Sequence, residues 1–156
     1  MTNPEPEQKT AIILDILERN AIPALINTAA GGLQKPAGHS SKLIHFVAQI
    51  PYDWIFPKVY AVIHHGGSGT THSALKNGCA TMIIPHIIDQ FFWNELIASK
   101  GVGPKGMPVK KFSRKLLEPR LLDLFTTKAY KQKAQEIEAE IEKENLDDEF
   151  YDVLSA

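Results

Sequence analysis

The stretch HHGGSGTTHSALKNG, residues 64–78, joins two apolar segments and indicates how the chain folds. VYAVI (59–63) precedes it and CATMIIP (79–85) follows it, and both are typical of strands buried on two faces. Two glycines and a run of hydroxyl residues lie between them, which predicts a tight turn and a helix from near Thr70 to Gly78. A strand, a helix and a second strand in this order indicate neighbouring parallel strands.

The rest of the chain continues this alternation. The sequence patterns predict helices over 2–20, 89–101, 113–125 and from 127 onward, strands over 23–29 and 43–50, a short helical turn over 51–59, and loops over 31–41 and 104–112. Alternation through the first hundred residues predicts an α/β, Rossmann-like fold: a mostly parallel sheet with helices on both faces. In such sheets, ligands bind beyond the carboxyl ends of the strands.

Length and charge restrict the classes of function. A chain of 156 residues with 44% apolar residues fits one domain or one half of a two-domain protein. With 17 basic and 18 acidic residues the net charge is −1, so there is no general positive field to hold a nucleic acid. Any recognition of phosphate must therefore be local.

The single cysteine, Cys79, excludes an internal disulfide and suits a reducing compartment, so we expect a cytoplasmic protein. No apolar run approaches the ~18 residues of a membrane span, and none is expected. The polar, acidic start of the chain is unlike a signal peptide.

The glycine turn has the chemistry of an anion site. Glycines allow close approach to the backbone, and the predicted helix directs free N–H groups of Ser68, Gly69, Thr70 and Thr71 outward with its positive dipole end. The hydroxyls in this run and the imidazole of His65 supply further donors. A diphosphate matches the charge and size of such a site.

Two other interpretations of this stretch are open. The turn could be a glycine-rich helix start without a ligand, because it has neither the Gly-Lys-Ser/Thr ending of a P-loop nor the Gly-x-Gly-x-x-Gly pattern. His64, His65, His72 and His86 could also bind a metal. Adjacent histidines rarely bind one ion, however, and no His-x-x-x-His spacing occurs, so we expect no metal.

A second polar pair, Asp89 and Gln90, follows the apolar strand at 80–85. It should lie at the same sheet edge as the glycine turn, one strand away. A carboxylate beside a carboxamide supplies acceptors and donors for neighbouring sugar hydroxyls. The alternative is that Asp89 only caps the next helix. The aromatic residues at 91–93 are expected to be mostly core.

The segments PYDWIFPKVYAVIHHGGSGTTHSALKNG (51–78) and IIPHIIDQFFWNELIASKGVGP (83–104) resemble the donor-binding half of inverting nucleotide-sugar glycosyltransferases. The resemblance is to the sterol-glucosyltransferase and antibiotic-glycosyltransferase branch of the GT-B superfamily, and it runs from about residue 4 to residue 125. The resemblance rests on a His-Gly-Gly-x-Gly-Thr turn and on an Asp-Gln pair that follows it in the sequence.

The resemblance implies a role for each matching residue. Asp89 and Gln90 would bind the transferred sugar, and the backbone at Ile50, with Trp54, would lie near the nucleotide base. The donor diphosphate would be held by His65, Gly67, Ser68, Gly69 and Thr70. Neither a metal nor a cofactor is implied, and the substrate would be a UDP- or TDP-sugar.

The implied activity is transfer of a hexose to an acceptor hydroxyl with inversion. Residues 1–126 would form the donor-binding domain, and 127–156 a charged helix and acidic tail packed on it. Relatives enter this domain through a strand that has no counterpart here, and their N-terminal domain binds the acceptor and supplies the general base. The resemblance therefore assigns no catalytic residue to this chain.

We accordingly expect the chain alone to be inactive and to need an acceptor-binding half, fused or as a companion chain. The unpaired strand edge should favour self-association. The alternative is a non-catalytic module: a nucleotide-sugar-binding subunit, or a domain that only docks on a partner.

Overall fold

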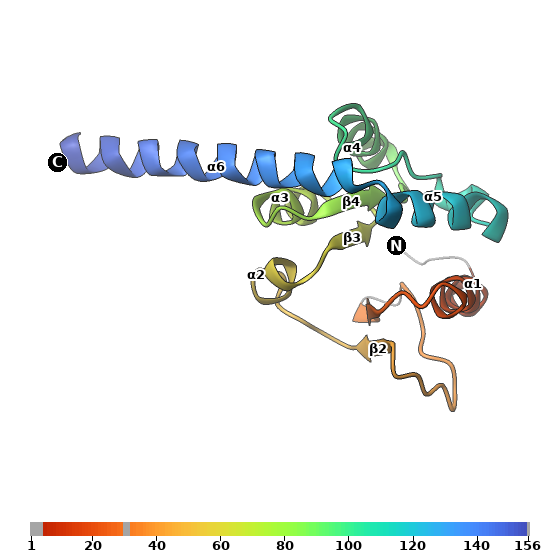
Figure 1. Cartoon of the computed structure of the whole chain (residues 1–156). Coiled ribbons are helices and arrows are strands. Elements are labelled where there is room, and N and C mark those ends of the chain that lie inside the picture. Colours follow the sequence, from red (N-terminus) through yellow and green to blue (C-terminus); the bar gives the residue numbers. More distant parts are fainter. Residues whose placement is uncertain (1–4, 30–31, 156) are drawn as a thin grey trace.

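The computed structural model describes residues 5–29 and 32–155; for 145–155 it describes only the backbone, which is helical. The chain alternates helices and short strands (Figure 1) and confirms the predicted α/β class. The elements are α1 (Pro6–Arg19), β1 (Ala24–Asn27), β2 (Ile44–Val47), α2 (Tyr52–Ile55), η2 (Phe56–Lys58), β3 (Ala61–His64), α3 (Ser68–Lys76), β4 (Ala80–Ile83), α4 (Ile88–Ser99), η3 (Val109–Lys111), α5 (Arg114–Thr126) and α6 (Lys128–Ser155). The predicted first helix thus begins at Pro6, and the part of the prediction over 2–4 lies outside the described residues.

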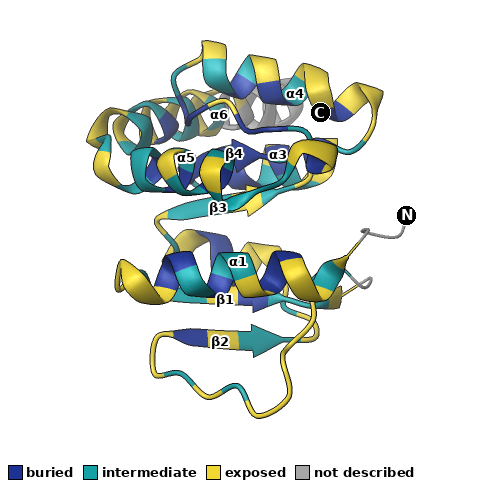
Figure 2. Cartoon of the chain, turned by 90° about the vertical axis from the view of Figure 1, so that its right-hand side faces the viewer, coloured by how far each residue is buried: buried dark blue, intermediate teal, exposed yellow. Residues whose placement is uncertain are grey.

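The parallel sheet is divided into two pairs of strands. β1 pairs with β2, with Ala24 opposite Ile44, and β3 pairs with β4, with Ala61 opposite Ala80. All four strands run in the same direction, with β1 and β3 as the inner neighbours (Figure 2). Among the described residues no strand joins the two pairs, so β1 and β3 each have an unpaired edge, as the resemblance implied.

The main core lies between α1, α5 and the strands. Its fully or almost fully buried side chains include Ile16 of α1, Met82 of β4 and Leu121 of α5. Burial of such side chains stabilises a fold by about 1.5–3 kcal/mol each. A second cluster joins Ile55 and Phe56 to Ala74 and Cys79, and Cys79 is fully buried as a small core residue.

An irregular segment covers the outer edge of β4. The Thr81 N–H donates to the Val102 carbonyl (3.1 Å), and residues 102–104 are buried. A Cβ atom added at Gly103 or Gly106 would collide with the carbonyl oxygen of Thr81 or Ile83, so only glycine allows this close approach. The predicted loop over 104–112 is therefore partly a buried edge cover, with one short 3-10 helix, η3.

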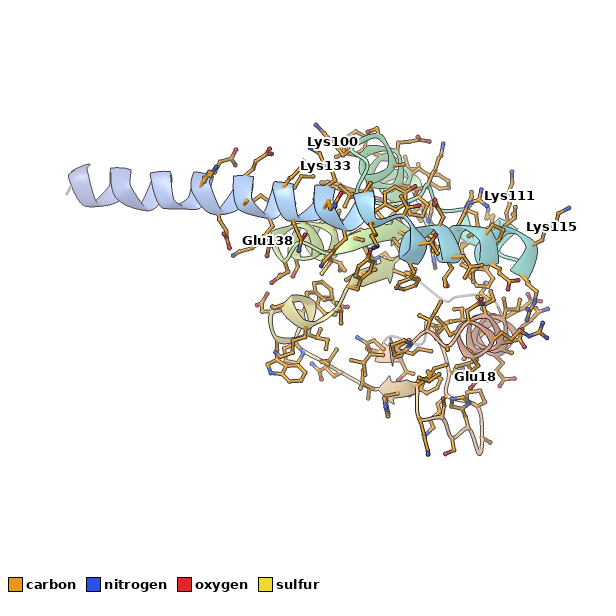
Figure 3. All side chains as sticks on the ribbon, viewed as in Figure 1. Glu18, Lys100, Lys111, Lys115, Lys133 and Glu138 are labelled. Carbon is orange, nitrogen blue, oxygen red and sulfur yellow. The ribbon has the colours of Figure 1, made fainter. Side chains whose placement is uncertain are left out.

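The C-terminal helix α6 packs on α3 and β4 and then extends beyond the rest of the chain (Figure 1). The Lys131 Nζ donates to the Gly78 carbonyl (2.7 Å). The Glu138 side chain, which projects from α6 (Figure 3), lies close to Gly78. Ala134 is fully buried, whereas Ile137 and Ile141 are half-buried. The predicted helix is present, and it continues to Ser155 where a tail was expected. Over the described residues, none of the helices has the length and apolar character needed to traverse a membrane.

Candidate functional site

The glycine turn connects β3 to α3 at the carboxyl end of the strand, as predicted. Gly66 has a φ of +99°, and a Cβ atom there would lie 2.7 Å from Ile83 Cγ2 and 3.1 Å from Gln90 Cβ. A side chain at position 66 is therefore excluded both by the backbone conformation and by the space available. The turn packs directly against Gln90, so the structure brings the two polar stretches of the sequence together.

The start of α3 provides three free backbone donors. The helix begins at Ser68, two residues earlier than predicted, with Gly67 at the N-cap position. The N–H groups of Ser68, Gly69 and Thr70 have no partner among the described residues. Such groups, with the helix dipole behind them, are suited to bind an anion.

Thr71 does not belong to this set of donors, which corrects the sequence-based expectation. Its N–H and its hydroxyl both donate to the Gly67 carbonyl, each over 2.9 Å, and the residue is fully buried. Thr71 therefore closes the first turn of the helix and holds the N-cap. The hydroxyls of Ser68 and Thr70 remain from the predicted set.

His65 lies beside Gly67, the N-cap residue of α3. Its Nε2 is 3.0 Å from the position that a Cβ atom on Gly67 would take, so the glycine makes room for the imidazole. The side chain is exposed, and its ring centroid lies 6.2 Å from that of His86. An imidazole N–H in this position can donate to an anion bound at the helix N-terminus.

His64, considered from sequence only as a possible metal ligand, instead shapes the turn. Its Nδ1 accepts a hydrogen bond from the Gly66 N–H (3.0 Å), and its Nε2 is out of contact with solvent and has no partner among the described residues. Burial, and secondarily the proximity of His65, lowers the pKa of His64 to about 3. The ring is therefore neutral at pH 7. In the described part of the chain, no three metal-binding side chains lie close enough to hold an ion.

This lowered pKa predicts how stability depends on pH. The unfolded chain takes up a proton at His64 near pH 6.5 and the folded chain does so only near pH 3, so folding stability should fall as the pH drops between these values. The loss is up to about 1.4 kcal/mol per pH unit. We expect His64→Asn, which keeps an acceptor for the Gly66 N–H but cannot titrate, to reduce this loss in urea unfolding at pH 7, 6, 5 and 4.

The pKa of His86 is also lowered, chiefly by burial, so His86 contributes to the same loss of stability in wild type and in His64→Asn. The difference between wild type and His64→Asn therefore reports on His64 alone. If wild type and His64→Asn lose stability in parallel from pH 6.5 to 4, His64 does not have the neutral, buried role described above.

Gln90 holds the backbone at the start of α4, whereas the Asp89 side chain has no hydrogen bond or ion pair with another described residue. Helix α4 has Ile87 at its N-cap, so the alternative in which Asp89 caps the helix is wrong. Gln90 is 5% exposed, and its Oε1 accepts hydrogen bonds from the backbone N–H groups of His86 (2.7 Å) and Ile87 (3.2 Å). Its Nε2 has no partner among the described residues. Asp89 is exposed in the first helical turn, where its carboxylate is available to a ligand.

The two residues expected near the nucleotide base lie at and beside α2, which contacts α3. Ile50 is half-buried against the cluster around Ile55. Trp54 is 57% exposed, with the Lys58 Nζ 4.1 Å from its ring centroid. Trp54 is therefore not part of the core.

Other side chains at the start of α4 differ from expectation. Phe91 and Phe92 are exposed, whereas Trp93 is half-buried and lies edge-on to His72, with 5.7 Å between ring centroids. Sequence reasoning also missed Asn94, which is 3% exposed. Its Oδ1 accepts a hydrogen bond from the Gly106 N–H (2.9 Å), and its Nδ2 donates one to the Gly106 carbonyl (3.1 Å). These two bonds fix α4 to the segment around Gly103 and Gly106 that covers the outer edge of β4.

Known proteins resemble this chain in sequence over most of its length. A protein-family model described as "Erythromycin biosynthesis protein CIII-like, C-terminal domain" matches residues 25–154. The sterol 3-beta-glucosyltransferase UGT80A2 of Arabidopsis thaliana is 42% identical over 114 residues, which cover 73% of this chain and 18% of the relative. The chain thus corresponds to less than a fifth of that enzyme's length.

Two solved structures have a similar fold. The glycotransferase of kitacinnamycin superposes with a TM-score of 0.74 at 12% identity, covering 87% of this chain and 35% of the other. The glycosyltransferase VinC, solved in complex with DTDP, superposes with a TM-score of 0.60 at 26% identity, covering 66% of this chain and 26% of the other.

Proposed function

Because the chain belongs to the erythromycin biosynthesis protein CIII-like C-terminal domain family, with a GT-B fold, we propose that it is the donor-binding half of a glycosyltransferase. One observation carries this proposal. The free N–H groups at the start of α3, with His65 over them, form an anion site whose turn touches Gln90 at the next strand end.

In the proposed reaction, a hexose passes from a UDP- or TDP-sugar to an acceptor hydroxyl with inversion. The acceptor oxygen attacks the anomeric carbon in line while the bond to the diphosphate breaks. The charge that develops on the diphosphate is stabilised by the start of α3 and by His65, so this chemistry uses no metal or cofactor. The base that takes the acceptor proton comes from an acceptor-binding half.

The sugar lies between the two parts of the site. The exposed carboxylate of Asp89 accepts hydrogen bonds from sugar hydroxyls, and the Nε2 of Gln90 donates one. Sterol glucosyltransferases are among the relatives, so we propose a sterol-like or other lipid-like hydroxyl as the acceptor, in a cytoplasmic reaction.

Replacing His65 by Ala should weaken UDP binding by about 1–3 kcal/mol, the range for a hydrogen bond to a charged group. Titration calorimetry of wild type and variant with UDP and TDP measures this difference. His72→Ala is the matched control, because His72 is an exposed histidine of α3 that contacts Trp93, whereas His65 lies in the turn before this helix.

Titrations with ADP and NAD test the class of ligand. We expect both to bind more weakly than UDP or TDP. Preference for ADP or NAD would contradict the proposed donor, and equal affinities of wild type and His65→Ala for UDP would remove His65 from the diphosphate site.

A further inference from the structure

Two imidazoles lie side by side where β3 and β4 end. The strands pair in parallel, with His64 opposite Ile83, and the Ile84 N–H donates to the His64 carbonyl (2.9 Å). The next residues of each chain segment, His65 after β3 and His86 after β4, therefore leave the sheet at the same edge. Their ring centroids are 6.2 Å apart, with 67° between the ring planes.

The fold holds the backbone of His86 and leaves its ring unused. The His86 N–H donates to the Oε1 of Gln90 (2.7 Å), and Gln90 packs against the turn at Gly66. The imidazole itself is half-buried and forms no hydrogen bond or ion pair with another described residue. A polar ring that is fixed in place and has no partner of its own is available to a ligand.

Positive charge gathers around this ring. Burial, and then the charges of His65 and Lys9, lower the pKa of His86. Lys9 belongs to α1 and is only 7% exposed, with its Nζ 6.0 Å from the ring centroid of Phe112. Three groups that can each carry a positive charge are therefore neighbours in a chain whose net charge is −1. Such a local cluster favours the binding of an anion.

The other charged groups beside His86 are on the adjoining elements. Glu5 acts on Lys9 and partly opposes the lowering of its pKa by burial. Asp89 of α4 and Lys110 of η3 are both exposed. In the part of the chain that the structure describes, neither histidine of the pair has an ion pair with a carboxylate. A bound anion would therefore be the direct counter-charge of the two rings.

We propose that His86 is a second phosphate-binding residue of the donor site, and that it takes up a proton when the diphosphate of the nucleotide sugar binds. This inference rests on the proposed function. His65 and the start of α3 hold one phosphate. His86 is joined through its backbone to Gln90, so it lies on the side of the sugar and holds the phosphate attached to that sugar. The anion stabilises the charged form of the imidazole.

The proton gives donor binding a defined pH dependence. The pKa of His86 in the free chain is below the ordinary value of 6.5, so its ring is mostly neutral at pH 7. A bound diphosphate raises this pKa, and the complex then carries more protons than the free chain. Affinity should therefore rise as the pH falls, by up to about tenfold per pH unit for one proton taken up. The rise ends below the pKa of the free ring, where His86 is already charged.

Titration calorimetry of the chain with UDP-glucose at pH 8, 7 and 6 tests this inference. UDP-glucose is the probe because its diphosphate, unlike that of UDP, has no terminal phosphate that titrates near pH 6. Repeating the pH 7 titration in two buffers of different ionisation enthalpy, neither of them phosphate, gives the proton uptake. We expect uptake by wild type, and an affinity at least about threefold higher at pH 6 than at pH 8.

His86→Gln is the matched variant, because glutamine can still donate to a phosphate but cannot titrate. It also keeps the backbone N–H that Gln90 accepts. We expect this variant to lose more than half of the proton uptake and to bind with a weaker pH dependence. His86→Ala should weaken binding about tenfold or more, the effect of losing a hydrogen bond to a charged group. His72→Ala should change neither quantity.

Proton uptake that is equal in wild type and His86→Gln, or absent from wild type, overturns the inference. Uptake that His65→Ala abolishes and His86→Gln retains assigns the proton to His65 and overturns it as well. In these cases UDP-glucose still binds, so the proposed function stands. If wild type does not bind UDP-glucose at any of the three pH values, the proposed function itself is wrong, and the inference with it.

Discussion

Replacing Gly106 by Ala should destabilise the fold by about 1–3 kcal/mol or more, the range expected when a methyl group is added to a well-packed interior. The new Cβ would collide with the carbonyl oxygen of Ile83, which is part of β4 and cannot rotate away as a flexible side chain could. The collision also separates Gly106 from Asn94 and leaves buried polar groups without partners. Urea unfolding of wild type and variant measures the change.

Gly32→Ala is the control, since a Cβ atom at that glycine would have no heavy atom of another described residue within 4 Å, its chain neighbours aside. It should alter the free energy of unfolding by less than about 0.5 kcal/mol. A similar small effect of Gly106→Ala would mean that the edge segment does not approach β4 closely in solution. The two glycines cannot be distinguished by residue type, so the large difference is a consequence of the fold alone.

The elements that sequence reasoning identified correctly are those whose pattern is local. The strands at 61–64 and 80–83 are short apolar runs between turn residues, and the glycines at 66 and 67 indicate a turn before a helix. Their order along the chain is sufficient to place the turn and the Asp89–Gln90 pair at one sheet edge, and the contact of Gly66 with Gln90 confirms that neighbourhood.

Local patterns could not show which polar groups the fold itself uses. Thr71 and Gln90 look like ligand donors in the sequence, but their hydrogen bonds go to Gly67 and to the N–H groups of His86 and Ile87. Asn94 pairs with Gly106, twelve residues away, and such pairing depends on how the edge segment runs along β4. The division of the sheet also has no local mark in the sequence, because β1 and β3 are each regular strands. Only the resemblance to known glycosyltransferases implied an unpaired strand edge.

The 156-residue chain alone should transfer sugar at least about 10²–10⁴-fold more slowly than the same chain fused to an acceptor-binding half, which is the contribution expected of a positioned general base. Among the described residues no histidine forms an ion pair with a carboxylate that would orient it as a base. The His64 ring is neutral, its Nε2 has no contact with solvent, and its Nδ1 accepts a hydrogen bond within the turn. His65 lies beside Gly67 at the start of α3, where we propose that the diphosphate binds. The measurement is transfer from UDP-glucose to a sterol, with the N-terminal part of UGT80A2 placed ahead of residue 1 as the acceptor-binding half.

The fusion allows this chain's own contribution to be separated from that of the added half. His65→Ala in the fused protein should lower kcat/KM about tenfold to a hundredfold, because 1.4 kcal/mol of lost transition-state stabilisation is a factor of ten. His72→Ala should leave it unchanged. If the fusion transfers sugar equally well with and without His65, the donor is held elsewhere and the proposed diphosphate site is wrong. If the unfused chain already transfers sugar at the rate of the fusion, the general base lies within these 156 residues. The proposal that an acceptor-binding half supplies this base is then wrong.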